Sequence, residues 1–214
     1  MRSLPGGDAG SVDLDLVPAH LIAPRLRRLA FGAIALGVVV GVIVALFASA
    51  TVALVVGAVI AAPTALSALL AARRRIWMDG TVIHAHSGVR AVTVDAARAV
   101  SAELLVRSGR VSQVALKLAD GDRSVTVPLA LYTTDGGREL DVLPLRSLAD
   151  GLVSGELAPA VAMSEALIGQ LRAEARGAGL DERPLYRAVT LAREANRVPR
   201  TTLTDDEVVR LTSG

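Results

Sequence analysis

The chain has 214 residues, of which 52% are hydrophobic and 21% charged, with no cysteine and a formal net charge of +2. The lack of cysteine excludes a disulfide framework. Residues 76–214 hold 16 Arg and Lys residues against 18 Asp and Glu residues, so the positive excess lies in the first 75 residues, which argues against a nucleic-acid-binding domain.

The first 24 residues contain three prolines and three glycines, and no helical or strand period runs far through them. Terminal segments of this kind are poorly ordered unless something ties them down. We therefore predict a disordered N-terminal tail over residues 1–24.

A run of 44 residues without a charged side chain, Leu29–Ala72, follows the tail. One apolar helix needs about 20 residues to cross the hydrocarbon core of a bilayer, so this run suits two helices joined by a tight turn. We predict a transmembrane hairpin over residues 25–75, with spans near residues 29–47 and 52–72. A signal peptide cleaved after Ala48-Ser49-Ala50 is the alternative, but its apolar segment exceeds the usual length of about 7–15 residues.

Arginines bracket the hairpin at both ends, and the predicted turn has none. Basic residues gather on the cytoplasmic side of a membrane, so both termini are expected in the cytoplasm. Only one of the 23 basic residues is a lysine, a bias typical of GC-rich bacterial genomes, so we expect a bacterial plasma membrane. The topology-setting residues are Arg25, Arg27, Arg28, Arg73, Arg74 and Arg75.

The two predicted spans contain no ionisable side chain, which favours an anchor over a transporter. Gly37 and Gly41 are four residues apart, a spacing that lets helix backbones approach closely. We expect close packing there, either within the hairpin or between chains. Trp77, just after the second arginine cluster, is expected to be an interfacial aromatic anchor.

From residue 76 the apolar residues recur with a period of two, and Asp-Gly pairs separate the runs. This pattern predicts antiparallel strands joined by hairpins. The clearest hairpin joins residues 111–119 to residues 123–131, and another joins residues 81–87 to residues 89–95. Five or six short strands predict one small antiparallel sheet or partly open barrel. The residues expected in its core are Val114, Leu116, Val125 and Val127.

After Pro144 the period lengthens to that of helices. Pro144 begins a short helix that closes a β domain over residues 76–155, and residues 156–214 are predicted as a helical C-terminal region. The fold class is therefore a membrane-anchored α+β protein. The residues predicted to cap the later helices are Ser164, Asp181 and Thr204.

A membrane hairpin, then Arg73-Arg74-Arg75-Ile76-Trp77, then a small meandering sheet closed by a helix resembles the bacterial pleckstrin-homology-like membrane proteins. The resemblance covers roughly residues 26–155 and rests on architecture, not on a signature motif. It implies a pleckstrin-homology-like (PH-like) sheet or barrel that serves as a binding or assembly module and not as an enzyme. The helical tail after Pro159 lies outside the family pattern.

No catalytic or cofactor motif is present: Gly-x-Ser-x-Gly, the Gly-x-x-x-x-Gly-Lys phosphate loop and Gly-x-Gly-x-x-Gly are all missing. His84 and His86 would point to one face of a strand, as metal ligands can. A third ligand would have to come from Asp79 or Asp95, so paired polar strand residues are the better interpretation. We expect no cofactor and no metal.

The helix predicted over about residues 183–196 separates basic from apolar side chains around its axis. The simpler interpretation is an amphipathic helix packed on the sheet with a solvated basic face. The alternative is a face that contacts an anionic leaflet or an acidic partner, although Glu194 falls within it. The arginines of this basic stripe are Arg183, Arg187, Arg193 and Arg197.

These features favour a non-enzymatic, membrane-anchored cytoplasmic binding or scaffolding module, with the membrane and a protein partner or a second copy as its contacts. One alternative is an accessory subunit of a larger membrane complex, whose glycine-bearing spans would pack against other helices. Another is an enzyme with an unrecognised site, which would require a pocket with convergent polar groups in the soluble domain.

Overall fold

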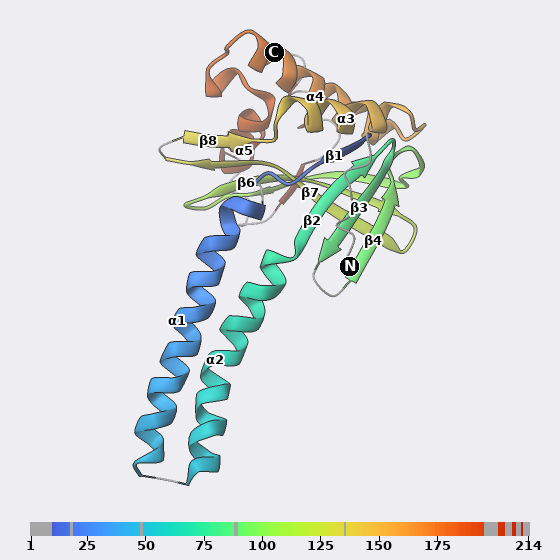
Figure 1. Ribbon diagram of the computed structural model, residues 1–214. Helices are drawn as coiled ribbons and strands as arrows, with labels where there is room; N and C mark the ends of the chain where they lie inside the picture. The colour runs from blue at the N-terminus through green and yellow to red at the C-terminus, as the bar shows by residue number, and fades with distance from the viewer. Residues whose placement is uncertain are drawn as a thin grey trace. The chain divides into compact units, whose positions relative to one another are not determined.

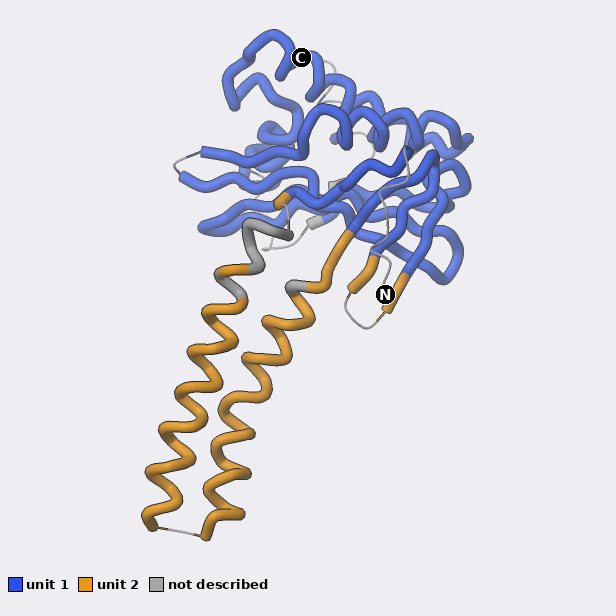
Figure 2. Tube along the Cα trace, in the orientation of Figure 1, with its two compact units in different colours: residues 1–16, 76–85, 92–214 blue, residues 17–75, 86–91 orange. Residues whose placement is uncertain are grey.

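The structure is a computed structural model that describes residues 10–17, 19–47, 49–87, 90–134, 136–194, 201–203, 207–208 and 211. The chain divides into two compact units (Figure 2). The hairpin unit comprises residues 17–75 and 86–91, and the α+β unit comprises residues 1–16, 76–85 and 92–214.

The hairpin unit consists mainly of two long helices, α1 (Ala19–Ala45) and α2 (Ala50–Ala72). Their apolar stretches, Arg27–Ala45 and Ala50–Ala71, have mean hydropathies of 2.3 and 2.2 and are long enough to cross a membrane. The bounds of these apolar stretches agree with the predicted spans to within about two residues, and their insertion into a membrane stays a prediction. However, α1 begins well inside the tail predicted to be disordered. Pro24 lies in its second turn, where it removes one backbone hydrogen bond and crowds the carbonyl group four residues earlier.

Glycines bring the backbones of α1 and α2 together. A Cβ on Gly37 would lie 2.7 Å from the carbonyl oxygen of Gly57 and 2.8 Å from Cβ of Ala61. A Cβ on Gly41 would lie 3.3 Å from the carbonyl oxygen of Ala53. Gly37 and Gly41 therefore lie at a close approach of the two helices within the hairpin, and a side chain at position 37 would force the backbones apart.

The first of two sheets corrects the predicted N-terminal tail. Its first strand pairs antiparallel with the second, Val12 opposite Met78. Leu14 and Leu16 then enter the core, and Arg138 donates from Nε to the carbonyl oxygen of Leu16 at 2.9 Å. The segment alternates apolar and polar residues, a short period-two pattern that the surrounding prolines and glycines obscured. The strands, in sheet order, are β1 (Ser11–Asp13), β2 (Arg74–Asp79), β3 (Val82–Ser87) and β4 (Arg90–Asp95).

The second sheet has five strands in the order β8-β7-β6-β5-β9, so the prediction of one sheet or barrel becomes two sheets. Its central hairpin, β6–β7, turns at Gly121, whose φ of +60° suits glycine. The four predicted core residues are confirmed, because each is at most 3% exposed. The strands are β5 (Ser101–Arg107), β6 (Ser112–Asp120), β7 (Arg123–Thr133), β8 (Gly136–Glu139) and β9 (Thr201–Leu203).

Helices complete the α+β unit and pack on one side of the second sheet (Figure 1), with α5 in contact with β5, β6 and β7. Pro144 does lie in the first turn of α3, as predicted. Ser164 does not cap a helix, because α4 begins at Ala158; instead it is buried and its hydroxyl donates to the carbonyl oxygen of Ala149 on α3 at 2.9 Å. The helical elements are η1 (Ala96–Arg98), α3 (Val142–Val153), α4 (Ala158–Ala175), η2 (Leu180–Glu182) and α5 (Pro184–Glu194).

The boundary predicted at residue 155 does not separate two domains. Helix α3 packs along α4, and one core joins both sheets to the helices. Residues 207, 208 and 211 are helical, and Val208 and Leu211 are buried in that core. The predicted cap Thr204 lies outside the described residues. The sheets and the C-terminal helices therefore form a single folded unit.

Candidate functional site

The basic stripe of α5 makes internal contacts. Arg183, which precedes the helix, forms an ion pair with Glu139 and donates from Nε to the carbonyl oxygen of Ala178. Arg187 donates from Nη1 to the carbonyl oxygen of Leu211, and Arg193 donates from Nη2 to Ser112 Oγ at 2.8 Å. Arg197 lies outside the described residues. The three described arginines thus help to hold the α+β unit together, and contact of the stripe with a leaflet or partner stays a prediction.

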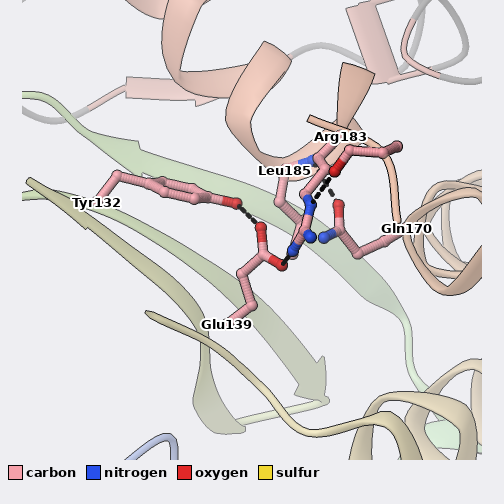
Figure 3. Close-up of polar contacts among 6 residues, drawn as sticks. Tyr132, Glu139, Gln170, Arg183 and Leu185 are labelled. Carbon is pink, nitrogen blue, oxygen red and sulfur yellow. Dashed lines mark hydrogen bonds and ion pairs between the residues drawn. The ribbon is translucent and has the colours of Figure 1, made fainter. Parts of the chain in front are cut away.

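Arg183 belongs to a partly buried polar group that we call the Glu139 cluster: Tyr132, Glu139, Gln170 and Arg183 (Figure 3). The Tyr132 hydroxyl donates to Oε1 of Glu139 at 2.6 Å, and the Arg183 guanidinium binds Oε2 of the same carboxylate. Burial, and then the hydrogen bond to the Glu139 carboxylate, raise the pKa of Tyr132 well above its usual value near 10. Tyr132 therefore stays a neutral donor. The cluster links the second sheet to the segment that starts α5.

Gln170 on α4 is fully buried, and its side-chain oxygen accepts a hydrogen bond from the backbone N–H of Leu185 at 3.2 Å. This bond positions the start of α5 against α4. The Nε2 atom of Gln170 has no hydrogen-bond partner among the described residues, and it is turned toward the Glu139–Arg183 pair (Figure 3).

Beside this cluster a groove of about 540 Å³ runs between α4 and the η2–α5 segment. The chain returns along α4 because Gly177, at φ +65°, ends that helix. Its N–H donates to the carbonyl oxygen of Glu174, and the N–H of Ala178 donates to the carbonyl oxygen of Ala173. Gly169 allows the close approach, since a Cβ there would lie 3.3 Å from Cγ of Pro184. We call this hollow the arginine groove. Its charged residues are Glu165, Arg172, Arg176, Glu182 and Arg187.

The residues predicted to set topology lie around the start of the apolar stretch of α1 and directly after α2. Arg27 and Arg28 are on α1, Arg73 caps the C-terminus of α2, and Arg74 and Arg75 begin β2. The side chains of these five arginines are exposed, whereas nothing is described of the Arg25 side chain. Their placement on either flank of the apolar stretches is the arrangement from which the cytoplasmic orientation was predicted.

His84 does not join His86 in an evident ligand set. Its ring stacks on Trp77, with ring centroids 5.2 Å apart, and its Nδ1 lies 3.4 Å from Thr93 Oγ1. No three His, Asp or Glu residues gather to hold a metal ion in the parts of the chain that the structure describes. The Trp77 ring, expected as an interfacial anchor, is half-buried in this stack.

Comparison with family models, curated proteins and solved structures found no match to this chain. The site must therefore be argued from its own residues.

Sequence reasoning found the arginines of α5 but missed the groove beside them. Glu165, Gly169, Arg172 and Arg176 recur at intervals of four, three and four residues, which places them on one face of α4. The sequence alone shows this spacing. It does not predict the groove, because only the fold brings Glu182 and Arg187 opposite that face of α4.

Proposed function

We propose that the protein is a non-enzymatic binding or scaffolding module, anchored in a bacterial plasma membrane by α1 and α2 with both termini in the cytoplasm. One observation carries the proposal: the two helices expose large apolar side chains along their length. Phe31, Val38 and Leu54 are 69%, 60% and 73% exposed. Surface of this kind is costly in water and suits a lipid environment. The arginine clusters at both ends support the orientation.

The proposed orientation is tested with a reporter enzyme that is active only outside the cytoplasm. We expect silence when it is fused to either terminus, and activity when it is inserted into the turn between α1 and α2. A reporter active at the C-terminus would overturn the two-span topology. An insertion in the turn that stays silent would also contradict it, because the hairpin would then not cross the membrane.

A PH-like role in binding or assembly is part of this proposal. It is supported by the order of the elements, in which two apolar helices precede small antiparallel sheets and further helices. The test is affinity purification of the full chain from native membranes. We expect a partner that is retained by the wild-type protein and by Thr126→Asp, on the exposed face of β7, but lost with Val125→Asp, which disrupts the core. Equal recovery with all three proteins would contradict a role for the folded α+β unit.

The second candidate function is that of an accessory subunit in a larger membrane complex. It is favoured by an apolar groove of about 430 Å³ along the hairpin, which we call the hairpin groove, lined by small residues including Gly37, Gly57 and Ala58. Ala58→Trp would fill this groove, whereas Val59→Trp, which does not line it, is the control. Loss of a co-purifying membrane protein with Ala58→Trp alone would favour this candidate, and equal retention would oppose it.

A further inference from the structure

The arginine groove brings together three guanidinium groups. Arg172 is exposed in the last turn of α4, Arg176 is exposed at its C-cap, and Arg187 lines the same groove from α5. In the described part of the chain, neither Arg172 nor Arg176 has a carboxylate oxygen within ion-pair distance. Arg187 has partners of its own, among them the carbonyl oxygen of Leu211, to which its Nη1 donates.

Arg172 and Arg176 are four residues apart, and like charges at that spacing on a helix repel each other. The C-terminal dipole of α4 offsets part of this repulsion for Arg172 and Arg176. An oxyanion between them would offset more, because guanidinium groups bind phosphate and carboxylate oxygens through paired N–H donors. The guanidinium groups of the groove therefore favour the binding of an anion.

The two acidic residues of the groove restrict the anion. Glu165 and Glu182 leave the five charged side chains with a net charge of +1, which disfavours an extended polyanion such as RNA. They can instead accept hydrogen bonds from hydroxyl or ammonium groups next to a single anionic group. The volume of about 540 Å³ lies within the range of small-molecule sites, about 300–1,000 Å³.

We propose that the arginine groove binds a phosphomonoester, with the phosphate held by Arg172 and Arg176 and polar groups of the ligand held by Glu165 and Glu182. The groove lies in the helical region after Pro159, outside the part of the chain that carries the family resemblance. The proposal rests on the proposed binding role, whose ligand class it names, but it does not depend on the membrane topology. The phosphate can belong to a soluble metabolite or to a lipid headgroup.

The test uses the full chain in detergent micelles, with inorganic phosphate as the probe and chloride at matched ionic strength as the reference. Phosphate should raise the melting temperature of the wild-type protein more than chloride does. In titration calorimetry Arg172→Gln/Arg176→Gln should bind phosphate at least about tenfold more weakly, because charge-assisted hydrogen bonds are lost. The control, Arg123→Gln/Arg146→Gln, removes the same charge from exposed sites on β7 and α3 and should bind as the wild-type does.

Two further arms identify the source of the phosphate. Glycerol phosphate in solution tests for a soluble ligand. Phosphatidic acid mixed into the micelles tests for a lipid headgroup, with phosphatidylcholine as the reference. Tighter binding of glycerol phosphate or of phosphatidic acid than of inorganic phosphate supports the proposal. Glu182→Gln should strengthen the binding of inorganic phosphate by removing a nearby negative charge. The proposal is overturned if phosphate acts no differently from chloride on the wild-type protein, or if the control weakens binding as much as the groove variant. Neither result would alter the reporter-fusion outcome, so the two failures are distinguishable.

Discussion

Glu139 joins two parts of the chain that are distant in sequence. Its carboxylate accepts from Tyr132 on β7 and from Arg183 ahead of α5, and only 10% of the side chain is exposed. Both oxygens are therefore used, as a buried carboxylate requires. The edge-to-face contact of Tyr132 with Tyr186, at 5.1 Å between ring centroids, adds an apolar link between β7 and α5.

Glu139→Ala should lower the free energy of unfolding of the α+β unit by about 2–3 kcal/mol. Breaking a fully buried ion pair costs about 3–5 kcal/mol. The cost is smaller here because the Arg183 side chain is 23% exposed, so water can hydrate its guanidinium group after the carboxylate is removed. Denaturant unfolding of the full chain in detergent measures the loss. Glu156→Ala removes an exposed carboxylate and should change stability by less than about 0.5 kcal/mol. Equal effects of the two substitutions would contradict a structural role for the cluster.

Stability should also fall at alkaline pH, and Tyr132 should account for part of the loss. The folded state raises the pKa of Tyr132, so it holds the phenol proton more tightly than the unfolded state, where tyrosine titrates near about pH 10. The resulting stabilisation is complete below that pH and is lost as pH rises above it, by about 1.4 kcal/mol per pH unit. Unfolding measured from about pH 9 to about pH 11 tests this slope. Tyr132→Phe should flatten it, whereas Tyr186→Phe should preserve it.

At the scale of elements, strand β1 shows how a short segment becomes ordered by its partner. Three residues cannot form a stable strand alone, but β1 pairs with β2, and the N–H of Leu14 donates to the carbonyl oxygen of Ile76 at 2.8 Å. Asp15 accepts the N–H of Ile76 in return. The N-terminal segment is thus part of the α+β unit although the hairpin separates it from the rest in sequence.

Leu14→Ala should destabilise the α+β unit by about 2–5 kcal/mol, the usual cost of truncating a fully buried leucine. Leu143→Ala makes the same change on α3 at a side chain that is 72% exposed, and it should cost less than about 0.5 kcal/mol. Thermal or denaturant unfolding compares the two. If Leu14→Ala were as mild as Leu143→Ala, the N-terminal segment would not belong to the core.

The elements predicted correctly are those whose signals are local. The β6–β7 hairpin combines alternating residues with the Asp120-Gly121 turn, and the leucines of α3 repeat with a helical period. Strand β9 could not be predicted, because its pairing joins residues 201–203 to residues 104–106. The same holds for the site. The arginines of α5 could be predicted from the helical period, but the ion pair of Glu139 and the place of Arg172 in the arginine groove depend on contacts between elements that are distant in sequence.

For the whole molecule, the division into two compact units separates two sources of stability. In the hairpin unit the helix backbones approach closely at glycines, a kind of packing that can hold helices together in lipid. The α+β unit has a buried core that includes both sheets and the C-terminal helices, and burial of apolar surface away from water stabilises such a core. Damage to one unit should therefore leave the other intact.

The chain contains no cysteine, so this independence can be measured with a single introduced thiol. In intact cells Ser49→Cys, exposed at the start of α2, should react with a membrane-impermeant maleimide if the turn lies outside. Adding Val125→Asp should leave this labelling unchanged, yet make the α+β unit sensitive to protease, since a carboxylate in the core costs more than about 3 kcal/mol. Thr126→Asp, on the exposed face of the same strand, should preserve protease resistance. If Val125→Asp instead abolished labelling at position 49, insertion of the hairpin would require a folded α+β unit, and the two units would form one cooperative structure.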